Sequence, residues 1–191
     1  MPVDSLPGRT TVRSQRGKQQ GYTLLEMLIV AAIIVLVATL ALPSLSTDDL
    51  DSLDAATSEV VGAVRFAHSE AIRTGVPHGV HADQAGQRIR IYRLDTSVNP
   101  VVAVYDVYDP FTKQLYDLSF NGDVAISGVY FKFEGFIWAQ SFLGFSGGTG
   151  LPKYNDSGTI RMLETAYVRL SQNGVERTIN ISPMTGRVTV Q

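Results

Sequence analysis

The stretch QQGYTLLEMLIVAAIIVLVATLALP, residues 19–43, decides how this chain is organised. Its apolar part, residues 22–42, is 21 residues long, and only three of them are polar: Thr23, Glu26 and Thr39. A helix of this length spans about 31 Å, which is close to the hydrocarbon thickness of a bilayer. The sequence therefore predicts a single membrane-spanning helix over residues 22–42, with a carboxylate near its start.

Charge is distributed unevenly on the two sides of this stretch. Residues 1–21 carry four basic side chains and one acid, a net of +3, whereas the rest of the chain carries 12 basic and 17 acidic residues, a net of −5. A basic segment before an apolar run predicts a cytoplasmic N-terminus, with everything after Pro43 across the membrane. The acidity of the remainder argues against a general nucleic-acid-binding surface. The absence of cysteine excludes disulfides, thiolate zinc sites and cysteine nucleophiles.

The carboxylate of Glu26 needs a physical reason, because a charged group at a helix centre in lipid costs about 2.5–3.5 kcal/mol. Cleavage between Gly21 and Tyr22 would supply one, since Tyr22 would then carry a positive amine four residues before Glu26. In a staggered bundle of such helices, Glu26 of one subunit meets the amine of the next. A buried pair offsets part of its desolvation cost, which a lone charge does not. We therefore interpret Glu26 as a register contact between subunits.

A secretory signal peptide is the alternative interpretation of the same stretch. The triplet Thr39-Leu40-Ala41 approximates a small-residue cleavage site. However, the apolar stretch from Met27 to Leu42 is 16 residues, at or beyond the upper end of a signal core. A glutamate at its start is also unusual, so we favour the retained helix.

The hexapeptide GYTLLE, residues 21–26, resembles the class III signal of type IV pilins and type II secretion pseudopilins. In that family a prepilin peptidase cuts after the glycine and N-methylates the new first residue, usually phenylalanine. The resemblance implies that cleavage follows Gly21, that Tyr22 is the methylated terminus and that Glu26 is the assembly contact. It also places Pro43 where the family often has a helix-kinking proline.

Beyond the apolar stretch, the spacing of apolar residues predicts an amphipathic helix over residues 43–75. Its apolar positions recur every three or four residues: Leu50, Leu53, Val60, Val61, Val64, Ala67, Ala71 and Ile72. The helix should end near Thr74 and Gly75, because Pro77 follows. On this helix His68 reads as a surface or rim residue.

Residues 76–191 have the pattern of a β-rich domain. Expected strands fall within 88–94, 101–108, 124–133, 136–145, 158–162, 166–172, 175–181 and 186–190. Asn173-Gly174 is the strongest hairpin signal and Thr185-Gly186 a second turn, whereas residues 107–123 read as a long loop. The predicted fold class is α+β: a long N-terminal helix, with a transmembrane half and an amphipathic half, packed on an antiparallel sheet or sandwich.

A narrower resemblance covers the helix end and the last third of the chain. VRFAHSEAIRTGVPHGV, GFSGGTG and RTINISPMTGRVTV resemble stretches of the H-type secretion pseudopilins and the FimT/FimU minor pilins. The resemblance implies a minor pseudopilin of the type II secretion system, anchored in the inner membrane by one span with its C-terminal domain in the periplasm, and assembled into a periplasmic pseudopilus. Its implied partners are prepilin peptidase and other pseudopilins or pilins. The alternative is a FimT/FimU-like minor pilin that primes pilus assembly or helps DNA uptake.

Other chemistry is weakly indicated. Residues 144–148 satisfy G-x-S-x-G, but all three histidines precede Ser146, whereas the nucleophile-elbow order needs one after it. His78 and His81 lack an evident third metal ligand, so we expect a turn there. DNA binding would rest on the strand arginines: Arg88, Arg90, Arg93, Arg161, Arg169, Arg177 and Arg187. We expect a structural subunit with no catalytic residue, cofactor or metal.

Overall fold

The computed structural model describes residues 23–41, 44–120, 122–156 and 158–191, and the side chains of residues 38–50 and 156 are outside this description. The chain divides into two compact units, residues 1–43 and 44–191. The predicted positions of Gly21, Tyr22 and Pro43 lie outside the described residues.

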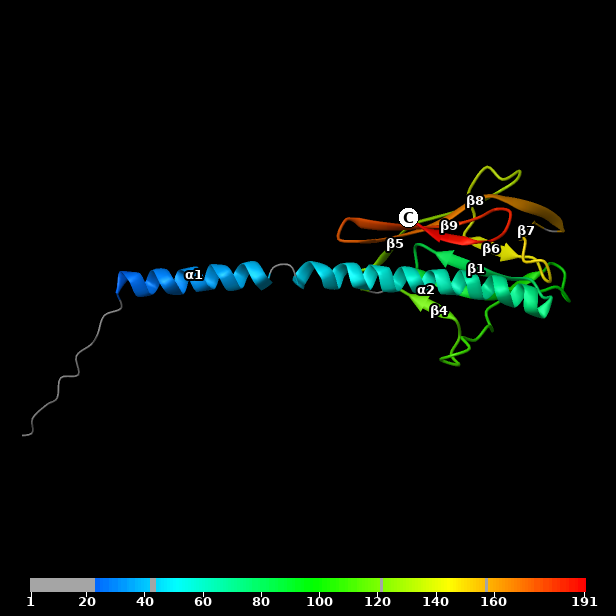
Figure 1. Ribbon diagram of the computed structural model, residues 1–191. Helices are drawn as coiled ribbons and strands as arrows, with labels where there is room; N and C mark the ends of the chain where they lie inside the picture. The colour runs from blue at the N-terminus through cyan, green and yellow to red at the C-terminus, as the bar shows by residue number, and fades with distance from the viewer. Residues whose placement is uncertain (1–22, 42–43, 121, 157) are drawn as a thin grey trace, which may run out of the picture. The chain divides into compact units, whose positions relative to one another are not determined.

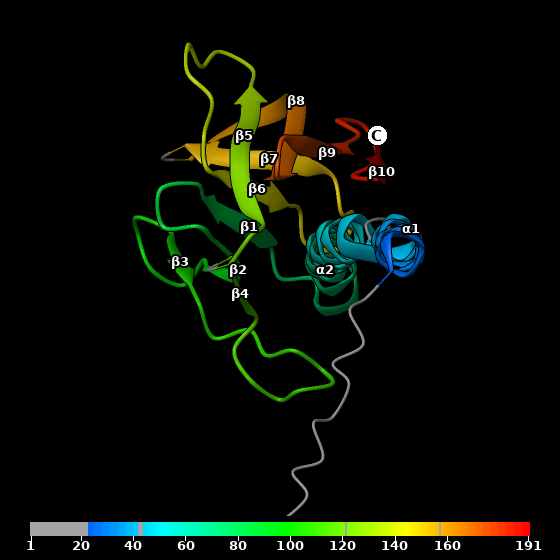
Figure 2. The same cartoon turned by 90° about the vertical axis from the view of Figure 1, so that its left-hand side faces the viewer.

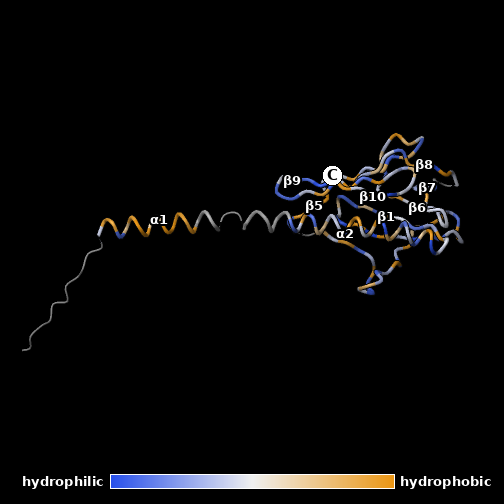
Figure 3. The backbone as a smooth tube through the Cα atoms, in the orientation of Figure 1, coloured by the Kyte–Doolittle hydropathy of each residue, from blue (hydrophilic) through white to orange (hydrophobic). Residues whose placement is uncertain are grey.

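The first unit contains one helix, α1 (Leu24–Ala41). Figure 3 shows it as apolar along most of its length, and the described side chains of residues 24–37 are exposed. Among the residues that the structure describes, no helix is both long enough and apolar enough to cross a membrane. The predicted membrane segment, residues 22–42, includes residues outside that description and stays a prediction.

The second unit packs one helix, α2 (Ser44–Thr74), against antiparallel sheet (Figure 1). In its described residues the sheet has ten strands: β1 (His78–Asp83), β2 (Arg88–Asp95), β3 (Val102–Val104), β4 (Asp117–Ser119), β5 (Ala125–Phe133), β6 (Phe142–Phe145), β7 (Pro152–Asp156), β8 (Thr159–Gln172), β9 (Val175–Ile181) and β10 (Val188–Val190). The strand order is β10-β9-β8-β7-β6-β1-β2-β3, with β4 beside β2 and β5 beside β8. The α+β class is confirmed.

Helix α2 buries the apolar stripe that its sequence predicts. Its buried residues are Leu53, Thr57, Val60, Val61, Ala63, Val64, Ala67 and Ala71. They pack against strands of both halves of the sheet, β1, β2 and β6 as well as β8, β9 and β10. Ile72 is an exception, because it is 45% exposed at the end of the helix, and the side chain of Leu50 lies outside the described residues. The helix ends at Thr74, and Gly75 follows with a φ of 71°, a conformation that glycine adopts without a steric penalty.

The long strand β8 joins the two halves of the sheet. Its first residues pair with β7, and its remainder pairs with β5 and β9. Figure 2 shows β5, β8 and β9 on one side of the domain and β1, β2 and β3 on another, with α2 beside them. The Asn173-Gly174 hairpin between β8 and β9 is confirmed, since both residues have positive φ, 49° and 83°.

Several predicted strand limits are wrong. The runs 101–108 and 136–145 form strands only over β3 and β6, and the predicted loop 107–123 contains β4. The runs 158–162 and 166–172 are one continuous strand, β8. β1 and β7 were not expected: the two histidines of β1 lie in a strand and not in a turn, and β7 begins with Pro152, a position where no ladder donor is needed.

Candidate functional site

The start of α1 is the part of the predicted N-terminal motif that the structure describes. The hydroxyl oxygen of Thr23 lies 3.2 Å from the backbone nitrogen of Glu26, which donates to it. The carbonyl oxygen of Thr23 accepts a bond of 3.2 Å from the nitrogen of Met27. Thr23 is therefore the N-cap of the helix and Glu26 its third residue, with its side chain exposed.

The exposed surface of α1 is almost wholly apolar. Large side chains at 11 described positions are more than a third exposed: Leu24, Leu25, Met27, Leu28, Ile29, Val30, Ile33, Ile34, Val35, Leu36 and Val37. An apolar surface of this extent needs lipid or other protein to cover it. Glu26 is the one carboxylate within it, so a helix that packs here meets both apolar side chains and a charge.

Four of the seven arginines that suggested a DNA-binding face form ion pairs with carboxylates. Arg88 forms an ion pair with Asp117, Arg93 with Asp106 at 2.7 Å, and Arg169 with Glu176 at 3.6 Å. Arg177 reaches across to Asp54 of α2 at 2.9 Å. Each carboxylate cancels a positive charge that a phosphate backbone would need.

Arg90 and Arg161 stack on aromatic rings. The Arg90 guanidinium lies 4.2 Å from the ring centroid of Tyr105, and that of Arg161 lies 4.6 Å from the centroid of Phe136. Of the seven arginines singled out from the sequence, Arg187 contributes only backbone bonds among the described residues. Within the described residues, four of the seven arginines thus have a carboxylate partner.

The G-x-S-x-G stretch does not have nucleophile-elbow geometry. Its first two residues end β6 and the chain then leads into strand β7, whereas the motif needs a helix after the serine. The nitrogen of Gly148 donates to the carbonyl of Ala71, so the loop closes over the end of α2. His68 packs edge-on against Phe145, as a rim residue of the core. Among the described residues no cluster of metal-ligating side chains occurs.

A polar and aromatic cluster on the outer face of β1, β2 and β6 was missed from the sequence. The His81 ring stacks on Phe142, with 4.0 Å between centroids and 5° between planes. Its Nδ1 lies 2.8 Å from the Tyr105 hydroxyl and 3.2 Å from an Arg90 nitrogen. Because arginine only donates, Nδ1 accepts and the ring is neutral. Burial and the Arg90 charge lower the pKa of His81, whereas Asp83 opposes this.

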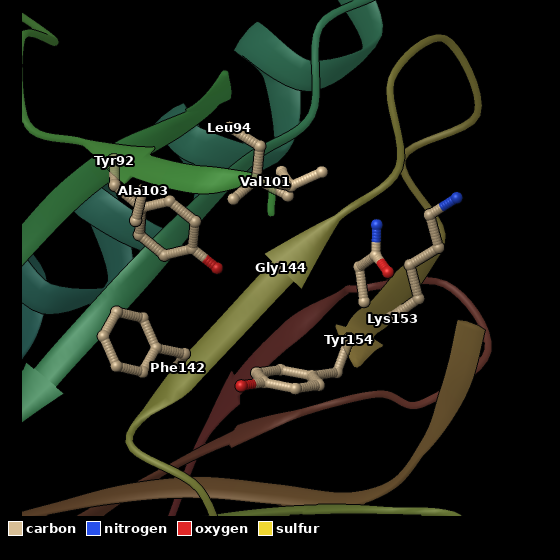
Figure 4. Close-up of a pocket in the computed structure, with 9 residues that line it drawn as sticks. Tyr92, Leu94, Val101, Ala103, Phe142, Gly144, Lys153 and Tyr154 are labelled. Atoms are coloured by element: carbon tan, nitrogen blue, oxygen red, sulfur yellow. The ribbon is translucent and has the colours of Figure 1, made fainter. Parts of the chain in front are cut away.

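Beside this cluster a cavity of about 190 Å³ opens between β2, β6, β7 and the segment leading into β3 (Figure 4). Tyr92 forms one wall and Tyr154 another, with Lys153 and Val101 at the rim. The alternation of RIRIYRL predicts that Arg90 and Tyr92 share a face of β2. The sequence does not indicate that Phe142 of β6 and Tyr154 of β7 lie beside these residues, because both are about 50–60 residues further along the chain.

The N-terminal stretch of the chain matches a known family model. Residues 16–42 match the family model described as "Prokaryotic N-terminal methylation motif". No curated protein sequence is significantly similar to the chain.

The solved structures that are similar to this one at low identity include three of minor pilins and pseudopilins. Two are the minor pseudopilin EpsH from the type 2 secretion system of Vibrio cholerae, each 14% identical, with TM-scores of 0.44 and 0.46; they cover 72% and 74% of this chain and 93% and 94% of theirs. The third is the type IV minor pilin FimU of Pseudomonas aeruginosa, 16% identical, with a TM-score of 0.41 over 75% of this chain and 90% of that one. The chain thus combines a prokaryotic N-terminal methylation motif at residues 16–42 with an α+β domain that follows it.

Proposed function

We propose that the chain is an H-type minor pseudopilin, a structural subunit of the periplasmic pseudopilus of a type II secretion system. The observation that carries this proposal is the methylation motif at residues 16–42, with Glu26 as the carboxylate in the first turn of an otherwise apolar helix. The globular domain supplies a packed core and ion-paired surface. In this function the chain is a building block and not an enzyme.

Processing prepares the chain for assembly. Prepilin peptidase cuts between Gly21 and Tyr22 and methylates the new amine, and the basic leader 1–21 keeps that end in the cytoplasm. Residues 22–42 then hold the subunit in the inner membrane, with residues 44–191 in the periplasm. Near the interface Glu26 keeps its charge in contact with water until the subunit leaves the bilayer.

Assembly buries the apolar surface of α1 against neighbouring helices of other pseudopilins. The carboxylate of Glu26 then loses its water, and a partner of opposite charge is needed to offset that loss. The amine of Tyr22 on an adjacent subunit has the required charge. The pair fixes the axial register, because a helix shifted along its axis would bury Glu26 against apolar side chains.

A FimU-like minor type IV pilin is the second candidate function, since it would use the same N-terminal motif. DNA uptake would require unpaired cations on the domain surface. Arg88, Arg93, Arg169 and Arg177 are instead paired with carboxylates. This pairing favours a subunit of the secretion system over a minor pilin that binds DNA during uptake.

The experiment is replacement of Glu26 by valine in the intact protein in cells that carry the secretion system. We expect Glu26→Val to insert and to be cleaved normally, because the scissile bond and the leader are unchanged. Crosslinking to other pseudopilins should fail, since an unpaired buried amine costs about 3–5 kcal/mol. Secretion of a reporter exoprotein is the functional measurement, and wild-type secretion and crosslinking by the valine variant would contradict the assembly role.

A further inference from the structure

The cavity beside Tyr92 has on its wall a hydroxyl that solvent reaches, although the ring that carries it is buried. Tyr92 is only 3% exposed, and its hydroxyl points into the cavity (Figure 4). Among the described residues this hydroxyl has no hydrogen-bond partner. Burial raises the pKa of Tyr92, so the group stays a neutral phenol that can donate and accept.

The backbone around the cavity is shaped to hold this ring in place. Gly79 and Gly144 are paired across β1 and β6, and the Tyr92 ring covers both. A side chain at Gly79 would meet the ring and the Leu143 carbonyl oxygen. The hydroxyl is therefore held at the cavity by packing and not by a hydrogen bond, which leaves it available to an incoming group.

The size of the cavity points to a protein side chain as the occupant. Small-molecule sites are typically about 300–1,000 Å³, whereas this one is about 190 Å³. Leu94, Val101 and Phe142 give it apolar walls. A space of this kind fits one anchor residue of a partner protein, with an apolar body and one polar hydrogen for Tyr92.

The same chain displays a side chain with these properties. Trp138, the only tryptophan, is 78% exposed on the β5–β6 loop, and the adjacent Ile137 is 84% exposed. The base of the loop is fixed, because Phe136 packs on Tyr154 and Gln140 donates to the carbonyl of Phe131 at 2.7 Å. The loop thus presents two large apolar side chains from a fixed base, which lowers the entropy cost of binding.

The charges beside the two elements are complementary. Lys153 stands at the cavity rim with its ammonium directed away from the cavity (Figure 4), and Glu134 begins the loop that carries Trp138. In the described parts of the chain neither side chain has an ion-pair partner, although most other charged residues on the strands do. A contact that brings Trp138 to the cavity offers each of them the opposite charge.

We propose that the Tyr92 cavity receives Trp138 from a second copy of this chain, with the indole N–H donating to the Tyr92 hydroxyl and Glu134 facing Lys153. The contact joins the globular domains of two subunits. It uses different residues from the Glu26 contact of α1, so an experiment can contradict one contact without contradicting the other.

The test uses the absence of cysteine in the chain. Full-length Ile137→Cys, with its new thiol beside Trp138, is mixed with full-length Val101→Cys, which has its thiol at the cavity rim. The purified proteins are oxidised under mild conditions without any secretion component. The matched control replaces Val101→Cys by Met184→Cys, a site 75% exposed on the β9–β10 turn. Any association through α1 affects both mixtures equally.

The proposal predicts at least about tenfold more heterodimer with Val101→Cys than with Met184→Cys, the ratio that corresponds to 1.4 kcal/mol. Adding Trp138→Ala to the Ile137→Cys chain should reduce the yield to that of the control. Tyr92→Phe in the other chain keeps the ring and removes one hydrogen bond, and should lower the yield about two- to tenfold. Equal yields for the two mixtures, no heterodimer, or a yield that Trp138→Ala leaves unchanged would overturn the proposal.

A second measurement needs no substitution in the cavity. Because Trp138 is the only tryptophan, its fluorescence reports its own environment in the wild-type chain. We expect its emission maximum to shift to shorter wavelength as the protein concentration rises and the indole leaves water. An emission maximum that is constant over a concentration range in which the protein self-associates would also overturn the proposal.

Discussion

The hydroxyl of Thr23 accepts a hydrogen bond from the backbone nitrogen of Glu26 at 3.2 Å, which makes these two residues the ends of the first turn of α1. Thr-x-x-Glu is the sequence of a capping box, in which both residues stabilise the helix start. Of the two bonds of a capping box, the described residues contain the one that Thr23 accepts, so Glu26 contributes its backbone nitrogen to the helix start and its carboxylate to the proposed contact between subunits.

These two roles can be separated by substitution. Glu26→Gln keeps a residue type that suits this position of a capping box but removes the charge, whereas Thr23→Ala removes the cap, at a cost of about 1 kcal/mol, and keeps the charge. We expect Glu26→Gln to lose crosslinking to other pseudopilins and Thr23→Ala to retain most of it. The opposite order would mean that the helix start, and not the charge, limits assembly.

Gly79 is expected to tolerate no side chain. A methyl group there would collide with the Leu143 carbonyl oxygen and with the Tyr92 ring. Overpacking of this kind typically costs about 1–3 kcal/mol, so Gly79→Ala should lower the thermal midpoint of the intact protein.

Gly128→Ala on β5 is the matched control for Gly79→Ala. Its methyl would lie 3.6 Å from the Cβ of Arg169, an ordinary contact. Its midpoint should therefore stay close to that of the wild type. If the two variants have the same thermal midpoint, the close packing of Tyr92 on Gly79 does not contribute to stability.

Stability should fall in mild acid because of His81. Its pKa is lowered in the folded chain by burial and by Arg90, whereas the unfolded value is about 6.5. Above that value both states are neutral and the group has no effect. As the pH drops below it the unfolded chain takes up the proton first, so the free energy of unfolding decreases until the lowered folded pKa is passed.

The measurement is the thermal midpoint between neutral pH and about pH 5, compared for wild type and His81→Gln. The variant lacks the titrating group and should lose less stability over that range. Identical slopes for the two proteins would show that the His81 cluster does not couple folding to protonation.

The paired arginines predict weak binding to DNA. Titration of the intact protein with labelled duplex, followed by fluorescence anisotropy at physiological ionic strength, should give a dissociation constant weaker than about 10⁻⁴ M. Saturable binding that weakens steeply with salt would instead favour the minor-pilin alternative and would mean that the pairs at Arg88 and Arg177 open on contact with phosphate.

Local signals account for the parts of the fold that the sequence predicts. Gly75 ends α2 and Asn173-Gly174 turns β8 into β9, because both depend on the conformations of one or two residues. The alternation of polar and apolar side chains over residues 88–94 identifies β2 from that stretch alone. Those features need no knowledge of distant partners.

The predictions that were wrong concern elements that form by pairing between distant segments. β1 has two histidines and a glycine and becomes a strand because β2 and β6 flank it. Likewise β4 is only three residues long and is defined by its pairing with β2. The Tyr92 cavity is the clearest case, since its residues come from segments that only the sheet brings together, and no single stretch of sequence contains it.

The N-terminus of the mature protein tests the central claim most directly. Intact-mass and N-terminal analysis of the membrane-extracted protein should show a chain that begins at N-methylated Tyr22, and substitution of Gly21 by a bulky residue should leave the full 191-residue precursor. A mature chain that begins at Leu42 would identify residues 1–41 as a secretory signal peptide and would contradict the pilin-like account altogether.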